Sequence, residues 1–300
     1  MTEKRRNPKI KAAISQLWHL PLIQVFVPDR FYLKLQYRNF LGKKLNLDNP
    51  ATYNEKIQWL KLYDRKPEYT QMVDKYEVKN YIRNTIGEDY LIPLLGVYSA
   101  FDEIDFAVLP DQFVLKPNHT SGDVYICRDK KTIDYKQLRR DVERWLKRRY
   151  YWAHREWPYK NVIPRIICEQ FISEDNTVPD DYKVLCFNGK AKLIEVHMDR
   201  FENHLQDFYD ADWEKTGISQ GFESTERLYE KPIVFEKMIS LSETLARDMR
   251  HVRIDWFIVR DMLYFGEITF YDGSGLVPFD DEKDDYMLGS WINLPIKKLK

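Results

Sequence analysis

The spacing of hydrophobic positions changes about one third of the way along the chain. Residues 53–63 carry Ile57 and Leu60 at helical spacing, directly after Thr52 and Glu55, which stand three residues apart as in a capping box. Residues 74–83 form a second helical candidate, and near residue 112 the hydrophobic positions begin to alternate. We therefore predict a mainly helical N-terminal region, residues 1–110, followed by a body of mixed helices and strands, residues 111–300.

The body is predicted to consist of hairpins with helices between them. Strand-like runs at 112–117 and 124–127 flank a polar turn, and Asn188-Gly189 joins runs at 182–187 and 190–196. Asn-Gly supplies the positive φ angles of a type I′ turn, so this pair is a strong hairpin signal. The pattern also predicts a helix at 138–150, a strand within 162–172, a helix from Pro232, and a last hairpin from 252–259 and 262–271. Short turns favour antiparallel sheets and an α+β fold class.

Composition narrows the class of protein. Lys+Arg and Asp+Glu are equal at 47 each, which argues against a nucleic-acid partner because such proteins are basic. Hydrophobic residues make up 44%, enough for a sizeable core. The three cysteines are widely spaced and form no C-x-x-C motif, which predicts a reduced, cytoplasmic protein. No apolar run reaches the ~18 residues of a membrane-spanning helix.

Two basic segments leave a membrane-surface role open. The helix predicted at 138–150 has one apolar face, and its other face carries six cations: Arg139, Arg140, Arg144, Lys147, Arg148 and Arg149. A solvated face explains this cluster, and the alternative is contact with an anionic glycan or the inner membrane face. The chain also starts with a basic segment before an apolar stretch at 17–27, which we expect to be a helix packed on the body.

The last hairpin carries the clearest candidate chemistry. A three-residue loop at 260–262 would set Asp255 opposite Glu267, and Arg253 opposite Thr269. Carboxylates directly opposite one another repel unless a positive charge lies between them. Oxygen ligands suit Mg²⁺, so we predict a magnesium site here. The alternative is a pair of exposed carboxylates that Arg253 neutralises.

Three further segments carry candidate binding residues. Lys116 precedes the turn Thr120-Ser121-Gly122, whose hydroxyl and backbone N–H groups suit a phosphate, although polar turns are common in hairpins. Glu169 ends a hydrophobic strand, where its carboxylate suits an adenine amino group or is an ordinary strand-end residue. Lys183 lies within a strand and points either to solvent or into a site as a second phosphate-binding cation.

The order of these segments resembles that of the ATP-grasp superfamily, and more narrowly of its TupA-like branch, named for teichuronopeptide biosynthesis. The resemblance spans roughly residues 50–290. The segments that carry it are Phe113-Val-Leu-Lys-Pro-Asn-His-Thr-Ser-Gly122, Asp181-Tyr-Lys-Val-Leu-Cys-Phe-Asn-Gly189, Val252-Arg-Ile-Asp255 and Phe265-Gly-Glu-Ile-Thr-Phe-Tyr271, with Tyr53-Asn-Glu-Lys56 and Asp74-Lys-Tyr76 upstream.

The resemblance implies an ATP-grasp fold, in which two antiparallel sheets with helices clasp ATP, behind a mainly helical pre-ATP-grasp region. It also implies a role for each matched residue. Lys116, Lys183 and Lys75 would contact ATP phosphates, and Thr120, Ser121 and Gly122 would form a loop over them. Glu169 with Gln170, Phe171 and Ile172 would hold adenine, and Asp175 or Asn176 the ribose. Asp255, Glu267 and Thr269 would bind Mg²⁺, and Arg253 would meet the transferred phosphoryl group. Thr269 stands where the superfamily usually has Asn, which leaves open whether one or two metals bind.

The activity implied is ATP-dependent ligation of a carboxylate to an amine through an acyl phosphate. The branch suggests a uronic acid or an amino acid as substrate, in the biosynthesis of a bacterial cell-surface polysaccharide. The alternative is a glycosyltransferase that uses a nucleotide sugar, for which Asp210 and Asp212 have the D-x-D spacing of a metal site. The polysaccharide, the amine and the oligomeric state stay open.

Overall fold

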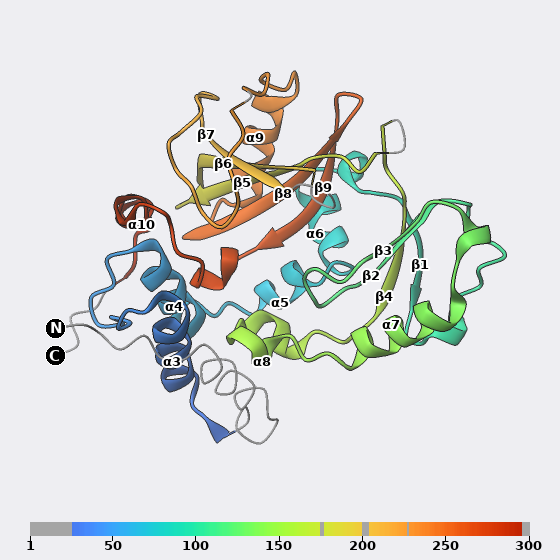
Figure 1. Cartoon of the computed structure of the whole chain (residues 1–300), viewed down its shortest axis with the longest axis horizontal. Helices are drawn as coiled ribbons and strands as arrows, with labels where there is room; N and C mark the ends of the chain where they lie inside the picture. Colours follow the sequence, from blue (N-terminus) through green and yellow to red (C-terminus); the bar gives the residue numbers. More distant parts are fainter. Residues whose placement is uncertain (1–25, 175–176, 200–203, 227, 296–300) are drawn as a thin grey trace.

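The computed structural model describes residues 26–174, 177–199, 204–226 and 228–295 (Figure 1). Two antiparallel sheets dominate this part of the chain. The four-stranded sheet has the order β1 (Leu94–Tyr98), β4 (Ile166–Gln170), β2 (Phe113–Pro117) and β3 (Tyr125–Cys127). The five-stranded sheet has the order β7 (Leu205–Asp210), β6 (Lys190–Met198), β5 (Asp181–Phe187), β8 (His251–Val259) and β9 (Met262–Thr269). The predicted α+β class with two antiparallel sheets is confirmed.

Helices surround the two sheets. The helices before the first strand are α3 (Asp29–Leu41), α4 (Tyr53–Tyr63), α5 (Glu68–Val73) and α6 (Val78–Thr85). The later helices are α7 (Tyr135–Lys147), α8 (Tyr151–His154), α9 (Phe235–Leu245) and α10 (Glu282–Trp291). Short 3₁₀ helices lie at Glu88–Tyr90, Phe101–Glu103, Lys130–Thr132, Trp157–Asn161 and Asp272–Gly275. The capping box predicted for α4 is confirmed, because Thr52 accepts from the Glu55 N–H and the Glu55 carboxylate accepts from the Thr52 N–H.

The division into two regions at residue 110 stays a prediction. Strand β1 lies before that position and pairs with β4, which lies beyond it. Phe101 and Leu109 also pack in one hydrophobic cluster with Phe113 of β2. The helical part of the chain therefore ends near residue 90, and the four-stranded sheet draws strands from both sides of residue 110.

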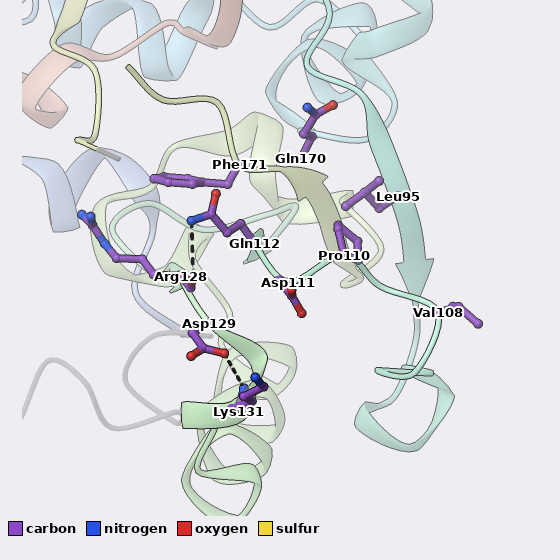
Figure 2. A pocket seen from close by; sticks show the side chains of 10 residues that line it. All are labelled: Leu95, Val108, Pro110, Asp111, Gln112, Arg128, Asp129, Lys131, Gln170 and Phe171. Carbon is purple, nitrogen blue, oxygen red and sulfur yellow. Dashed lines mark hydrogen bonds between the residues drawn. The ribbon is translucent and has the colours of Figure 1, made fainter. Parts of the chain in front are cut away.

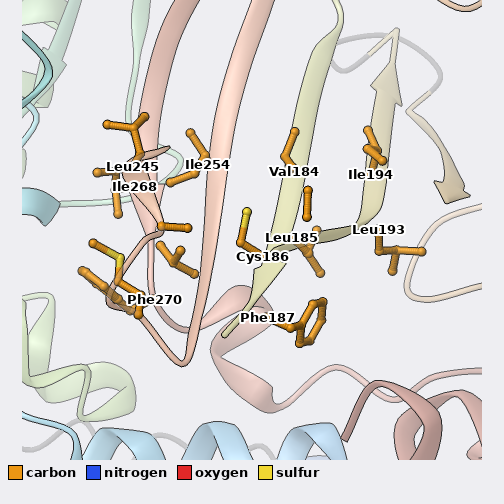
Figure 3. Packing of buried hydrophobic residues seen from close by; sticks show 14 of the residues in the cluster. Val184, Leu185, Cys186, Phe187, Leu193, Ile194, Leu245, Ile254, Ile268 and Phe270 are labelled. Carbon is orange, nitrogen blue, oxygen red and sulfur yellow. The ribbon is translucent and has the colours of Figure 1, made fainter. Parts of the chain in front are cut away.

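Each sheet is apolar on the face that a helix covers. Leu138, Val142 and Trp145 of α7 pack on the four-stranded sheet. On the five-stranded sheet Val184, Ile194, Ile254 and Ile268 are paired side by side across four strands (Figure 3). Trp256 shares that face and donates from its indole N–H to Ser242 of α9 at 2.8 Å. Because side chains alternate along a strand, the residues beside these point to the opposite face.

Two hairpin turns set the register of the five-stranded sheet. Asn188 and Gly189 have φ angles of 50° and 78°, so the predicted Asn-Gly turn is confirmed. The predicted three-residue loop of the last hairpin is wrong, because Arg260 and Asp261 alone form the turn, with φ angles of 51° and 58°, and Val259 pairs with Met262. Positive φ at both central residues matches the twist of the strands in a two-residue turn.

A bulge then corrects the register of the last hairpin. The pairing shifts by one residue between Asp255 and Trp256, which leaves Gly266 of β9 unpaired. Beyond the bulge Asp255 lies opposite Glu267, and Arg253 opposite Thr269, so both predicted pairings are confirmed. No described helix is both long and apolar enough to cross a membrane.

Candidate active site

A row of charged side chains crosses four strands of the five-stranded sheet on the face away from α9. Lys183 of β5 lies between Glu195 of β6 and Asp255 of β8, and Asp255 lies opposite Glu267 of β9. Neighbouring strands stand ~4.8 Å apart, so these four side chains form a compact polar site. Three of the four residues are almost fully buried.

Arg253 binds the acidic residues of this row together. Its Nε donates to Asp255 Oδ1 and its Nη2 to Asp255 Oδ2, both at 2.7 Å. The same Nη2 lies 3.2 Å from Glu267 Oε1 and 3.3 Å from Thr269 Oγ1, and Nη1 donates to Asp272. The Arg253 guanidinium therefore holds four side chains together, with the bidentate contact to Asp255 that its fork geometry allows.

Lysines complete the neutralisation of the two facing carboxylates. Lys183 Nζ lies 3.0 Å from Asp255 Oδ2, and Lys75 Nζ lies 3.2 Å from Glu267 Oε2. Burial raises the pKa of Glu267, but the charges of Lys75, Arg253 and Lys183 outweigh it and lower that pKa well below its ordinary value. The repulsion that motivated the magnesium prediction is thus answered by three cations of the chain itself.

Lys75 also joins the predicted phosphate loop to the last hairpin. Its Nζ donates to the carbonyl oxygen of Thr120 at 2.8 Å while it pairs with Glu267. The Thr120 hydroxyl donates to Asp123 at 2.8 Å. Ser121 and Gly122 are exposed, and Gly122 has a φ of 82°. The structure therefore brings Thr120 close to Glu267 and presents Ser121 and Gly122 at the surface.

The four-stranded sheet carries a second charged cluster. Glu169 of β4 receives Lys116 Nζ at 2.6 Å on one oxygen and Lys79 Nζ at 2.6 Å on the other. Burial raises the pKa of Glu169, but the two lysines outweigh it and the pKa is lowered. The residues predicted to hold phosphate and adenine thus bind each other, and Lys79, which sequence reasoning missed, completes the trio.

Residues 74–79 connect the two clusters. The Asp74 carbonyl accepts from the Val78 N–H at 2.9 Å, and its carboxylate accepts from the N–H groups of Tyr76 and Glu77, so the segment forms a capped helical turn. Lys75 and Lys79 are four residues apart, a rise of ~6 Å along a helix. One turn of chain thus reaches Glu267 on one sheet and Glu169 on the other, which makes the clusters two ends of a single site.

The other residues predicted at adenine and ribose lie around the end of β4. Gln170 and Phe171 line a pocket of about 960 Å³ with Gln112 and Arg128, and the Arg128 guanidinium stands 5.7 Å from the Phe171 ring (Figure 2). Ile172 follows them in the chain. Asp175 and Asn176 lie outside the described residues, so the ribose prediction has no structural counterpart here.

The two alternative motifs have structural partners of their own. Asp210 Oδ1 accepts from the N–H groups of Asp212 and Glu214 at 2.9 Å each, so this carboxylate shapes the turn after β7. On α7, Arg139 pairs with Asp102, Arg144 with Asp141, and Arg148 with Asp123. Half of the six-residue basic face is thus neutralised by neighbouring carboxylates, which weakens it as an anion-binding surface.

The residues present suit magnesium together with a phosphate ligand. Within the described residues, no three His, Cys, Asp or Glu side chains are arranged to hold a metal by themselves. Mg²⁺ in nucleotide sites takes one or two carboxylates and completes its shell with phosphates and water. Asp255 and Glu267 supply two facing carboxylates, and the Thr269 hydroxyl lies 3.0 Å from Glu267. The donor set therefore fits a metal that arrives with a nucleotide.

Sequence reasoning missed Glu195 and Asp272. An Asn-Gly turn with regular pairing would place Lys183 opposite Ile194, but the register shifts between Leu185 and Cys186, and Lys183 lies opposite Glu195. The only signal in the sequence was that Glu195 stands between the apolar residues Ile194 and Val196. Asp272 lies three residues after Thr269, the last residue of β9, and this position close to the hairpin could have indicated it.

A family model and several solved structures are similar to this chain. The family model described as TupA-like ATPgrasp matches residues 55–293. Among solved structures, D-alanine–D-alanine ligase from Bacillus anthracis, complexed with ATP, is 15% identical over 73% of this chain and 57% of that chain, with a TM-score of 0.39. L-amino acid ligase from Bacillus licheniformis is 13% identical over 84% of this chain and 57% of that chain, with a TM-score of 0.45. The chain thus spans less than two thirds of either ligase. No curated protein matches the sequence.

Proposed function

The chain belongs to the TupA-like ATP-grasp family, and from that premise we propose that it is an ATP-dependent carboxylate–amine ligase. The proposed reaction forms an amide through an acyl phosphate. A uronic acid or an amino acid supplies the carboxylate, and the product belongs to the biosynthesis of a bacterial cell-surface polysaccharide. Family membership supports ATP as the nucleotide, and the charged site supports phosphoryl transfer from ATP to a carboxylate.

The observation that carries this proposal is the crowding of cations and carboxylates around Arg253. Arg253, Lys183 and Lys75 reach the Asp255–Glu267 pair from three different segments of the chain. A carboxylate substrate, ATP and the product phosphate are all anions, so their reaction needs positive charge that is already in place. Cations that the carboxylates of the site already hold in place supply it without reorganisation.

The proposed reaction has two steps, a phosphoryl transfer and an acyl transfer, in which different residues act. In the first, a carboxylate oxygen of the substrate bonds to the γ-phosphorus of ATP and the bond to ADP breaks. In the second, the amine nitrogen bonds to the acyl carbon, the carbon–oxygen bond breaks, and phosphate leaves with the electron pair while the nitrogen loses a proton. Lys183, Lys75 and Lys116 bind phosphate oxygens, and Arg253 binds the phosphoryl group during transfer. Magnesium, held by Asp255 and Glu267, supplies neutralisation of the phosphate charge when bound.

The loop at Thr120 has a positioning role in this proposal. Lys75 links the carbonyl of Thr120 to Glu267, which supports a role for Ser121 and Gly122 beside the phosphates. In that role they would shield the acyl phosphate from water. Water would hydrolyse that intermediate to the starting carboxylate and phosphate. A cytoplasmic location with peripheral membrane contact is part of the proposal, because nucleotides and surface-polymer precursors meet there.

The glycosyltransferase alternative has weaker support. Asp210 and Asp212 line a pocket of about 570 Å³, and Asp281 and Asp284 line it too. Among the described residues that line this pocket, Lys192 is the only cation. Four aspartates repel the diphosphate of a nucleotide sugar. The Asp210 carboxylate is also occupied by two backbone N–H groups. We therefore give the ligase precedence.

The direct test is incubation with ATP, Mg²⁺ and a panel of uronic acids and amino acids, with hydroxylamine as the nucleophile. The proposal predicts carboxylate-dependent release of ADP and a hydroxamate whose mass identifies the carboxylate. A parallel reaction contains nucleotide sugars without ATP. Glycosyl transfer there, with no ADP release in the first reaction, would contradict the proposal.

A further inference from the structure

The polar face of the five-stranded sheet continues past Lys183 for two more strands. Glu195 and His197 of β6 and Gln206 of β7 lie on this face, and each is at most 8% exposed. His197 Nε2 stands 3.1 Å from Glu195 Oε2 and 3.4 Å from Gln206 Nε2, so the three side chains meet. No role in ATP or metal binding has been assigned to them. A sheet interior would ordinarily hold apolar residues here.

This extension has unsatisfied acceptors. Glu195 Oε1 and Gln206 Oε1 are buried and receive no hydrogen bond from a donor within the described residues. Both atoms are oxygens, so each calls for a partner that carries N–H or O–H groups. Buried acceptors are almost always paired in folded proteins. Two of them on one face of the site, both beside His197, indicate a ligand that donates.

The charge around Glu195 favours a cationic donor. Burial raises the pKa of both the Glu195 and the Asp272 carboxyl groups. The Glu195 charge raises the pKa of Asp272 further, whereas Arg253 and Lys183 offset part of the rise at Glu195. Two neighbouring carboxyl groups can stay close by sharing one proton. An ammonium group placed between them also removes their repulsion, and it offers three N–H donors. Asp181 and Asp255 are also buried on this face, where both pair with Lys183. With Glu195, Asp272 and Glu267, five carboxyl groups therefore lie near three cations, Lys183, Arg253 and Lys75.

The position of Glu195 suits the second step of the proposed reaction, in which the amine attacks the acyl group. Glu195 lies two strands from Asp255, a backbone separation of ~10 Å at ~4.8 Å per strand. A small amine held at Glu195 is therefore within reach of an acyl group near Asp255 and Glu267. At the outer end of the extension, His197 Nδ1 stands 2.8 Å from His204 Nε2, and the His204 ring packs 3.9 Å from that of the half-exposed Phe222. These rings form a rim for the body of the ligand.

We propose that Glu195, Gln206 and Asp272 form the subsite for the amine substrate, which binds as a primary ammonium with Glu195 Oε1 as its main acceptor. The inference rests on the proposed ligase function for the fate of that amine, but binding itself is independent of turnover. Secondary amides and alcohols lack the charge that the carboxyl pair selects.

The experiment measures amine binding to the full chain in the presence of ADP and Mg²⁺, by ligand-observed NMR titration. The probes are methylammonium, glucosamine and glycinamide, each against its N-acetyl form. At least one primary amine is expected to bind the wild-type protein, and at least about tenfold more tightly than its N-acetyl form. Glu195→Gln, which removes the charge at constant size, should weaken that binding about 10- to 100-fold, the loss expected for a charge-assisted hydrogen bond.

Controls keep the result interpretable. Glu236→Gln removes the charge of an exposed residue that pairs with Lys231, and should leave amine binding within about twofold of the wild type. If Glu195→Gln does not fold, Gln206→Leu removes the second acceptor and should weaken binding about three- to tenfold. Failure of every amine to bind the wild type, or equal binding by wild type and subsite variants, would overturn the inference. Amine binding without any carboxylate-dependent ADP release would instead refute the ligase function and leave the subsite standing.

Discussion

Asp255 joins Arg253 and Lys183 at the centre of the site. Both of its oxygens accept from Arg253, and one also accepts from Lys183. We expect Asp255→Asn to reduce ATP-dependent ADP release at least about 100-fold, because a preorganised electrostatic contact is lost. Steady-state ADP release measures this.

The same variant also tests the stability of the site. Opposed carboxylates alone would make Asp255→Asn stabilising, but Arg253 and Lys183 each lose a buried charge partner, so we expect a loss of about 2 kcal/mol in the free energy of unfolding. Asp261→Asn, at the exposed turn of the same hairpin, is the matched control and should change neither quantity. An Asp255→Asn protein with full activity would remove this residue from the mechanism.

His251 makes stability depend on pH. Its Nε2 lies 2.9 Å from the Tyr53 hydroxyl, and burial lowers its pKa to about 4. The unfolded chain binds this proton near pH 6.5. Stability should therefore fall as the pH drops from about 6.5 to about 4, by at most about 1.4 kcal/mol per pH unit for this residue, and should be fully present above that window. Urea unfolding at pH 5, 6 and 7 measures the slope. His251→Gln should flatten it, and an unchanged slope would contradict the assignment.

At the residue scale, alternation along strands identified the side chains on the functional face but not all of their partners. Asp255, Glu267 and Arg253 could be placed because a hairpin fixes which residues oppose one another. Lys79 could not be found, because its contact with Glu169 joins a helix to a strand about 90 residues later. Contacts at such a separation leave no local pattern in a single sequence.

At the scale of elements, two bulges decide which side chains meet. Gly266 is unpaired in β9, and a Cβ atom there would stand 3.1 Å from the Asp255 carbonyl oxygen. Gly266→Ala should therefore cost about 1–3 kcal/mol of stability by overpacking, and should reduce activity because it displaces the Asp255–Glu267 register. Chemical denaturation and ADP release measure the two effects.

Gly217 supplies the control for that substitution. A Cβ atom at Gly217 meets no atom within 4 Å, so Gly217→Ala should leave stability and activity nearly unchanged. Equal effects of the two substitutions would show that the bulge does not hold the register.

The hairpins could be predicted and their bulges could not. Turn residues and alternating hydrophobicity locate both ends of a hairpin, as Asn188-Gly189 shows. A bulge needs one extra residue and leaves the alternation broken in only one place. The predicted three-residue loop put the extra residue of the hairpin in the turn, whereas it is Gly266 in the bulge. Either placement puts one extra residue on β9 before Glu267, which is why the pairing at Asp255 was nevertheless right. Strand β1 escaped prediction because its five residues, Leu94-Leu-Gly-Val-Tyr98, include a glycine and show no alternation of apolar and polar positions.

At the scale of the whole molecule, one turn of chain at residues 74–79 reaches both sheets. Lys75 contacts Glu267 on the five-stranded sheet, and Lys79 contacts Glu169 on the four-stranded sheet. Lys75→Met should weaken ATP binding about tenfold, since it removes a phosphate contact and frees the loop at Thr120. Calorimetric titration measures the affinity. Lys283→Met, at a side chain that is 90% exposed, is the control, and equal affinities of all three proteins would contradict the bridging role.

The central claim is that one site joins nucleotide and carboxylate through an acyl phosphate. The most direct measurement uses a carboxylate substrate labelled with ¹⁸O in both oxygens, with ATP, Mg²⁺ and hydroxylamine, and reads the released phosphate by ³¹P NMR. Transfer of the phosphoryl group to the carboxylate, followed by cleavage of the acyl carbon–oxygen bond, places one ¹⁸O atom in each phosphate. We predict singly labelled phosphate from the wild-type protein and none from Asp255→Asn. Unlabelled phosphate, released by water alone, would contradict the account.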